Sequence, residues 1–290
     1  MIRVVAPAST ANLGPGFDAA AAALDLWNEV AVEEGSFAVE IEGEGADEIP
    51  CDASHLALRA FSLLAPFELY RFRFVNRIPL ERGLGSSAAS IALGLVAGAA
   101  VAGRRVTPGE LLALGERLEG HSDNLAAALY GGVCLAWRRN GTPRAQRIAG
   151  DMPAAPVLAV PGTRTGTAQS RNGLPFTIKH DDAATNAGAA ALLGAAIVAG
   201  DVELLRDALH DRLHEPYRLN TAPLLRELQA NAPEGTVGVT LSGSGPAVVV
   251  WADKRRTGDV ADALRHSLSD ETQVLPLAVA EEGAHVVVGV

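Results

Sequence analysis

The feature that most constrains this chain is a glycine-rich turn at residues 79–90, PLERGLGSSAAS, where a predicted strand meets a predicted helix. Residues 70–75 alternate aromatic or apolar side chains with arginine, the pattern of a half-buried strand. Residues 86–102 predict a helix, in a run too short and too rich in Gly, Ala and Ser to favour a membrane span. The sequence therefore predicts a strand, a tight turn and a buried helix in succession.

The turn itself is suited to binding phosphate. Gly83 and Gly85 allow the backbone to approach a ligand closely, and Ser86 and Ser87 bring hydroxyl and amide groups to the start of the helix. Unpaired N–H groups and the positive end of the helix dipole attract an anion there. A simple tight turn capped by serine has the same residues, so the turn alone leaves both interpretations open.

Composition narrows the class of protein. The chain has 290 residues, of which 48% are hydrophobic and 20% charged, the balance of a folded globular protein. The net charge of −10, with two lysines among 24 basic residues, excludes a diffuse cationic surface for nucleic acid. Cys51 and Cys134 match neither a zinc spacing nor a disulfide framework, and residues 1–7 lack the apolar stretch of a signal peptide. We expect a cytoplasmic protein with no nucleic-acid or membrane partner.

The secondary-structure pattern changes near the middle of the chain. The first half mixes strands and helices, which we expect at 2–6, 29–33, 37–42 and 70–75 and at 54–65 and 86–102. Another helix begins at Thr107, because Pro108 follows it and Glu110 completes a capping box. The second half predicts a strand, three helices, two strands, a helix and a strand, at 156–160, 182–199, 201–213, 221–231, 236–241, 246–251, 255–268 and 273–280. We predict an α+β fold with domains at 1–150 and 151–290, divided within turn-rich residues 140–155.

Three ordered motifs together resemble the GHMP kinases, the family of galacto-, homoserine, mevalonate and phosphomevalonate kinases. The turn resembles their P-x-x-x-G-L-G-S-S-A motif, residues 7–18 (PASTANLGPGFD) their N-terminal motif, and residues 240–247 (TLSGSGPA) their C-terminal glycine motif. From its residues alone the last segment could be only a hairpin. The resemblance covers nearly the whole chain and implies a two-domain fold, with an S5-like mixed N-terminal domain and a ferredoxin-like C-terminal domain.

Two further segments are similar to the homoserine kinase branch of that family. Residues 119–132 (EGHSDNLAAALYGG) resemble its E-G-H-P-D-N-V-A-P-A-x-x-G-G segment, and residues 210–218 (HDRLHEPYR) its D-x-L-H-x-P-Y-R segment. The chain departs from the branch at Ser122, where proline is usual, and at Trp27, where tyrosine is frequent.

The resemblance implies ATP-dependent phosphorylation of the hydroxyl of L-homoserine to O-phospho-L-homoserine, a step of threonine biosynthesis, by direct in-line transfer. ATP and Mg²⁺ are the implied cofactors, and a homodimer is a family-based expectation. One alternative is another GHMP kinase, of the shikimate or mevalonate type. The other is a non-catalytic nucleotide-binding regulator on the same fold.

By this resemblance the turn wraps the phosphates of ATP. The implied contacts are Pro79, Arg82, Gly83, Leu84, Gly85, Ser86, Ser87 and Ala88. Ser87 and Glu119 would hold Mg²⁺ in a shell completed by phosphate oxygens, with Glu116 as a rival ligand one helical turn earlier. Residues 55–61 would border the adenine, although the stretch 64–70 is shorter than in the family.

The resemblance also implies an amino-acid pocket. Its residues would be Asn12, Asp18, His121, Asn124, Thr167, Arg171, Arg218 and Gly243. Asp18 suits the ammonium of an α-amino acid, and the planar forks of Arg171 and Arg218 suit its carboxylate. Asn124 would orient the hydroxyl but cannot remove its proton, and Asp123 is not favoured as a base. The catalytic residues would therefore be Asn124, Ser87 and Glu119, acting by positioning and charge stabilisation.

Overall fold

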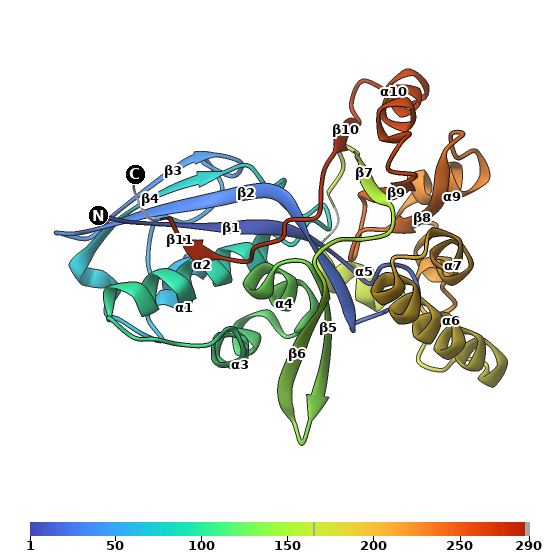
Figure 1. Ribbon diagram of the computed structural model, residues 1–290. Coiled ribbons are helices and arrows are strands. Elements are labelled where there is room, and N and C mark those ends of the chain that lie inside the picture. Colours follow the sequence, from blue (N-terminus) through green and yellow to red (C-terminus); the bar gives the residue numbers. More distant parts are fainter. Residues whose placement is uncertain (165, 288–290) are drawn as a thin grey trace.

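The computed structural model describes residues 1–164 and 166–287, and for residues 167–169 the backbone alone. It places a seven-stranded sheet beside a four-stranded sheet, each carrying its own helices (Figure 1). The α+β class predicted from the sequence is confirmed by this arrangement.

The first sheet is built on one long central strand. Its strands are β1 (Ile2–Ala11), β2 (Ala20–Glu34), β3 (Ala38–Gly43), β4 (Tyr70–Asn76), β5 (Val133–Arg139), β6 (Thr142–Ala149) and β11 (His285–Val286). All paired strands are antiparallel except β3 and β4, and β2 pairs with β1, β4 and β5. The sequence predicted only residues 29–33 of β2. Residues 20–24 are buried on both faces, so the polar alternation that indicates a strand is missing there.

Helices line one face of this sheet, below it in Figure 1. They are α1 (Leu56–Phe61), α2 (Ser86–Val101), α3 (Pro108–Glu119) and α4 (Asp123–Tyr130), with a short 3-10 turn at Phe67–Leu69. Helix α2 is the buried helix that the sequence predicted, and the capping box of Thr107 and Glu110 forms at the start of α3. Helix α1 is shorter than the predicted 54–65.

The second sheet has the order β10-β7-β9-β8 and is antiparallel throughout. Its strands are β7 (Ala155–Val160), β8 (Thr236–Leu241), β9 (Val248–Ala252) and β10 (Gln273–Pro276). Around it lie α5 (Thr167–Asn172), α6 (His180–Ala199), α7 (Val202–Ala208), α8 (Glu215–Arg218), α9 (Pro223–Ala230) and α10 (Thr257–Ser267). Helices α9 and α10 share a buried apolar cluster with the sheet. Among the described helices, α6 alone has the length and apolar composition for a membrane span, which by itself is weak evidence.

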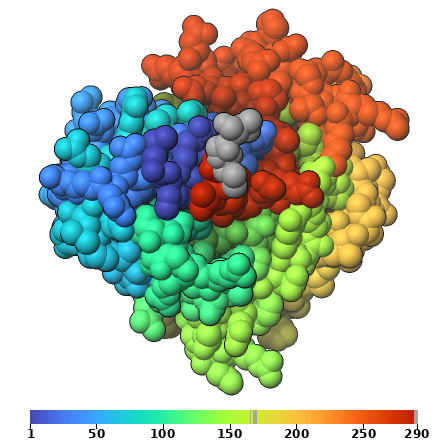
Figure 2. Space-filling model, turned by 60° about the vertical axis from the view of Figure 1, so that its left-hand side comes forward, coloured from blue at the N-terminus to red at the C-terminus, as the bar shows by residue number. Residues whose placement is uncertain are grey.

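The end of the chain returns to the first sheet. Strand β10 stops at Pro276, short of the predicted end at residue 280, and the chain then crosses to pair Val286 with Val4 of β1. Figure 2 shows this segment in red against the blue N-terminal strands. The domain boundary between residues 150 and 151 stays a prediction. Strand β11 follows this boundary in the sequence but belongs to the first sheet.

Candidate active site

A cavity of about 260 Å³ lies at the junction of the two halves. Its lining includes most of the residues that the sequence singled out, namely Asn12, Asp18, Gly83, Leu84, Gly85, Ser86, Ser87, Glu119, His121, Asn124, Arg171, Arg218 and Gly243. These residues come from the β1–β2 connection, the glycine-rich turn, the α3–α4 junction and three segments of the second half. Motifs that are far apart in the sequence therefore meet at one place.

Three predicted phosphate contacts do not line this cavity. Arg82 instead donates from Nε to the carbonyl of Pro161 and from Nη2 to that of Gly162, both at 2.9 Å. Pro79 lies beside Arg82 in a separate small pocket, and Ala88 is fully buried in α2. These two bonds from Arg82 connect the glycine-rich turn to the second half of the chain. The side chain of Thr167 lies outside the described residues.

The glycine-rich turn needs glycine for both conformation and space. Gly83 has φ of 79° and Gly85 has φ of 67°, in the left-handed region that favours glycine. A Cβ atom would lie 2.1 Å from the carbonyl oxygen of Ser242 at Gly83, and 2.1 Å from Oγ of Ser9 at Gly85. Helix α2 starts directly after this turn without a side-chain cap, so its first amides face the cavity with the positive end of the dipole.

A buried carboxylate faces the start of α2. Ser87 Oγ lies 2.7 and 2.8 Å from the two carboxylate oxygens of Glu119, and Nδ1 of His121 lies 3.8 Å from Glu119. Burial raises the pKa of Glu119, and the nearby negative charge of Asp123 raises it further. Glu116 forms its ion pair with Arg138 and does not line the cavity. Of the two candidate ligands, only Glu119 therefore contacts the turn.

Two charged residues proposed for opposite ends of the substrate are paired with each other. Arg171 donates from Nη1 and Nη2 to the two carboxylate oxygens of Asp18, at 3.0 and 2.6 Å. Asn12 fixes this region from both sides, because its Oδ1 accepts from the N–H of Asp18 at 3.0 Å and its Nδ2 donates to the carbonyl of Gly243 at 2.8 Å. The pair holds an anion and a cation side by side at the wall of the cavity.

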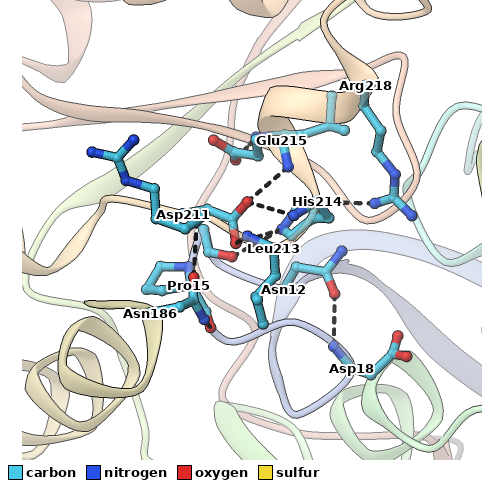
Figure 3. A network of polar contacts seen from close by, with 12 residues as sticks. Asn12, Pro15, Asp18, Asn186, Asp211, Leu213, His214, Glu215 and Arg218 are labelled. Atoms are coloured by element: carbon cyan, nitrogen blue, oxygen red, sulfur yellow. Dashed lines mark hydrogen bonds and ion pairs between the residues drawn. The ribbon is translucent and has the colours of Figure 1, made fainter. Parts of the chain in front are cut away.

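Arg218 is buried, with 2% of its surface exposed. Its Nη1 donates to Nδ1 of His214 at 3.0 Å (Figure 3). The same nitrogen donates to the carbonyl of Gly243 at 3.1 Å. Its buried Nε, like that of Arg171, has no hydrogen-bond partner among the described residues. The guanidinium groups of Arg218 and Arg171 lie 5.5 and 5.6 Å from the ring centre of Phe17. Both guanidinium groups therefore lie against the same aromatic ring.

Asn124 is oriented by a residue that sequence reasoning missed. Its Oδ1 accepts from Oγ of Ser9 at 2.8 Å, which leaves the amide nitrogen as the end available to a ligand. Phe17 and His214 were also missed. All three lie inside the quoted motifs, but each residue type also occurs in purely structural roles, so the motifs alone gave no reason to select them.

Glu215 gives the network in Figure 3 a pH dependence. Its carboxylate accepts from the N–H of Leu241 at 2.7 Å and from Gln229 at 3.1 Å, and burial raises its pKa to about 8 from a usual 4.5. Between these values the folded protein holds a proton that the unfolded chain has lost. The free energy of unfolding should therefore fall as pH rises through this interval, by up to about 1.4 kcal/mol per pH unit, and then level off.

Urea unfolding of the wild type and Glu215→Gln across this interval tests the prediction. The glutamine has no proton to lose, so the difference in unfolding free energy between the two proteins should shift with pH in favour of the variant. Parallel pH profiles would show that Glu215 does not titrate in this range.

Known proteins are similar to this chain in both fold and sequence. Family models of the N-terminal domain and the C-terminal domain of GHMP kinases match residues 53–132 and 190–270. A homoserine kinase of Streptomyces coelicolor is 40% identical, over 97% of this chain and 96% of its own length. The crystal structure of a homoserine kinase from Cytophaga hutchinsonii has a TM-score of 0.85 at 27% identity, covering 99% of this chain and 97% of that one. The structure of L. major mevalonate kinase with R-mevalonate has a TM-score of 0.73 at 16% identity, which shows a shared fold alone.

Both halves of the chain therefore define the same class of protein, the GHMP kinases, whose two-domain α+β fold the sequence predicted. The chain belongs to this superfamily and, within it, to the homoserine kinase family. The prediction that it is a small-molecule kinase is confirmed by this membership.

Proposed function

We propose that this protein transfers the γ-phosphoryl group of ATP to the hydroxyl of L-homoserine, giving O-phospho-L-homoserine for threonine biosynthesis. The observation that carries the proposal is one cavity in which an uncapped helix start faces the buried Arg218 and the partly exposed pair of Arg171 and Asp18. A helix start suits the phosphates, and the charged side chains suit a zwitterion. We expect the enzyme to act in the cytoplasm without nucleic-acid or membrane partners, and a homodimer stays an expectation.

The first half, residues 1–150, would bind the nucleotide. The amides of Gly85, Ser86 and Ser87 are placed to hold phosphate oxygens at the start of α2. The described residues contain no cluster of three or more His, Cys, Asp or Glu side chains suited to a metal. Mg²⁺ is usually held by one or two carboxylates together with substrate phosphates and water, so this sparse donor set fits it.

Ser87 and Glu119 are the residues that would hold Mg²⁺. Both present oxygen, and Glu119 is a buried carboxylate that contacts no arginine or lysine among the described residues, so a divalent cation would offset its charge. The ion would supply neutralisation of phosphate charge during transfer.

The amino acid would bridge the two halves. Its carboxylate fits the unpartnered Nε edges of Arg218 and Arg171, and its ammonium fits Asp18. Asp18 and Arg171 are paired with each other, so this ion pair would have to open as the substrate binds. The ammonium of the substrate would then replace Arg171 beside Asp18, and its carboxylate would replace Asp18 beside Arg171. This exchange would place the side-chain hydroxyl toward Asn124 and the glycine-rich turn, which share the cavity.

Asn124 would orient the attacking hydroxyl. Since Ser9 occupies its carbonyl oxygen, its amide nitrogen can donate to the hydroxyl oxygen and leave one lone pair directed at phosphorus. No general base is assigned, because Asp123 is buried, its pKa is raised by that burial, and one of its oxygens accepts the backbone N–H of Asn124 at 2.7 Å. A loose transition state does not require early deprotonation, so positioning and electrostatic stabilisation suffice.

We expect Asn124→Ala to lower kcat more than it changes the KM for homoserine, because the lost bond aligns the reacting hydroxyl. Ser9→Ala should lower kcat in the same direction but less, by about five- to tenfold, since it removes one hydrogen bond of about 1 kcal/mol that orients the amide. Initial-rate kinetics on both substrates measure this. An effect confined to KM would make Asn124 a binding residue only.

An ADP-release assay tests the function itself. Homoserine should be turned over well, and shikimate, mevalonate and galactose poorly. Preference for one of the other alcohols would assign a different GHMP kinase activity. Retained nucleotide binding without turnover of any alcohol would instead indicate a regulator on this fold.

A further inference from the structure

His214 joins two functional segments that are 200 residues apart. It precedes α8, its side chain is fully buried, and its Nε2 lies 2.9 Å from the carbonyl oxygen of Gly14 in the β1–β2 connection. On the other side, its Nδ1 lies 3.0 Å from Nη1 of Arg218 (Figure 3). The ring also stacks on Phe17, with centroids 5.0 Å apart. A single imidazole therefore touches the loop, the aromatic ring and the buried arginine.

The two partners determine where the imidazole carries its proton. A guanidinium has only donors, so Nδ1 must accept the bond from Arg218, and a carbonyl only accepts, so Nε2 must donate to Gly14. Only the neutral ring with its proton on Nε2 satisfies both. Burial lowers the pKa of His214 to about 4, which agrees with a neutral ring.

Asp211 does not compete for this proton. Its nearest carboxylate oxygen is 3.7 Å from Nε2 of His214, beyond hydrogen-bond distance. Its carboxylate instead accepts the backbone N–H groups of Leu213, His214 and Glu215 at 3.1, 2.8 and 2.7 Å. Asp211 therefore shapes the turn that carries the imidazole, and the imidazole bonds to Gly14 and Arg218.

The bond from His214 fixes one side of the Arg218 guanidinium. Both hydrogens of Nη1 are used, one by His214 and one by the carbonyl of Gly243. Because the guanidinium is planar, two acceptors on one nitrogen set the orientation of the whole group. The remaining donors are on Nη2 and Nε, and Nε is buried without a partner among the described residues. Since Arg218 lines the cavity, this Nε edge is the side left for an anion bound there.

We propose that His214, as the neutral ring protonated on Nε2, is a positioning residue that presents the Nε edge of Arg218 to the substrate carboxylate. The naming of the carboxylate rests on the proposed function. The imidazole acts through Arg218 and does not itself reach the substrate. Its bond to Gly14 has a separate task, which is to hold the β1–β2 connection against the second half.

Two substitutions separate these tasks. In His214→Asn the side-chain oxygen lies near the former Nδ1 and can still accept from Arg218, but the amide does not reach Gly14. In His214→Gln the amide nitrogen lies near the former Nε2 and can still donate to Gly14, but the acceptor for Arg218 is lost. The loop retains the bond from Asn186 to the carbonyl of Pro15, at 2.9 Å, in both variants.

We expect His214→Gln to raise the KM for homoserine by about tenfold or more, as for a lost hydrogen bond to a charged group. The KM of His214→Asn for homoserine should stay within about threefold of the wild-type value. The KM for ATP should differ little between the two variants. So should the turnover of an amino alcohol that corresponds to homoserine without its carboxylate. Equal rises of the homoserine KM in both variants, or equal losses on the amino alcohol, would overturn the proposal.

A nitrogen NMR spectrum of histidine-labelled wild type gives a readout that requires neither turnover nor a variant that folds. His214 should show a protonated Nε2 and a bare Nδ1 at neutral pH. A proton on Nδ1, or a doubly protonated ring, would contradict the proposal. If homoserine is not phosphorylated but this tautomer is found, the proposed substrate fails while the arrangement of Arg218 stands.

Discussion

Glu119→Gln should lower kcat by about a hundredfold or more at ordinary Mg²⁺ concentration and leave the fold intact. The substitution keeps the shape and a carbonyl acceptor for Ser87 but removes the negative charge that would hold the metal. Metal-assisted charge stabilisation contributes several kcal/mol to such reactions, and each 1.4 kcal/mol is tenfold in rate. Steady-state kinetics across a Mg²⁺ titration measure the loss, and excess Mg²⁺ should restore part of it.

Stability and activity should move independently in this variant. Burial raises the pKa of Glu119, which means that the charged form is disfavoured where it lies, so neutral glutamine should unfold at the same temperature or higher. Glu116→Gln is the matched control, because Glu116 pairs with Arg138, whereas Glu119 is the carboxylate bonded to Ser87. Normal turnover by Glu119→Gln together with a loss in Glu116→Gln would move the metal role to Glu116.

Arg218→Ala and Arg171→Ala should each raise the KM for homoserine by about ten- to a hundredfold and change the KM for ATP little. Each removes a charge-assisted hydrogen bond worth roughly 1.5–3 kcal/mol. Lysine at either position should rescue little, because an ammonium lacks the planar fork. Initial-rate kinetics with homoserine and ATP varied separately provide the measurement.

The amino alcohol without the carboxylate is the matched substrate for this test. It should be poor for the wild type and lose little more in either variant. Arg212→Ala is the control, because Arg212 lies in the same segment as Arg218 but does not line the cavity. If homoserine and the truncated analogue lose equally, the arginines support the fold or the phosphates, and the homoserine assignment loses its main chemical argument.

The sequence predicted the members of the cavity better than their contacts. The resemblance of the motifs to the GHMP kinases implied that Ser87, Glu119 and Arg218 share one site, and the cavity contains all three. The sequence could not show that the guanidinium of Arg82 bonds to three backbone carbonyls, since an arginine beside a phosphate-binding turn is equally suited to the phosphate. The roles of these residues stay predictions until they are tested.

One predicted helix is longer than the helix in the structure. The apolar pattern after Asp201 continues past residue 208, so a helix was expected to residue 213, but α7 ends at Ala208. Three residues later the carboxylate of Asp211 accepts consecutive backbone N–H groups and starts the next turn. That turn leads into His214 and Arg218. The chain therefore leaves the predicted helix just before the segment that brings Arg218 to the cavity.

The ion pair between Asp18 and Arg171 would compete with the substrate, because each side chain occupies the charge that the other would offer to an amino acid. Each partner already has the opposite charge that a zwitterion would bring, and the side chains are 40% and 36% exposed, so incoming charges can reach them. An amino acid can replace both partners at once. A hydroxy acid would leave Asp18 without a cation, and a neutral sugar would leave both side chains without an opposite charge. Discrimination among alcohols would then be set by the exchange of a salt bridge, before the hydroxyl reaches the phosphate.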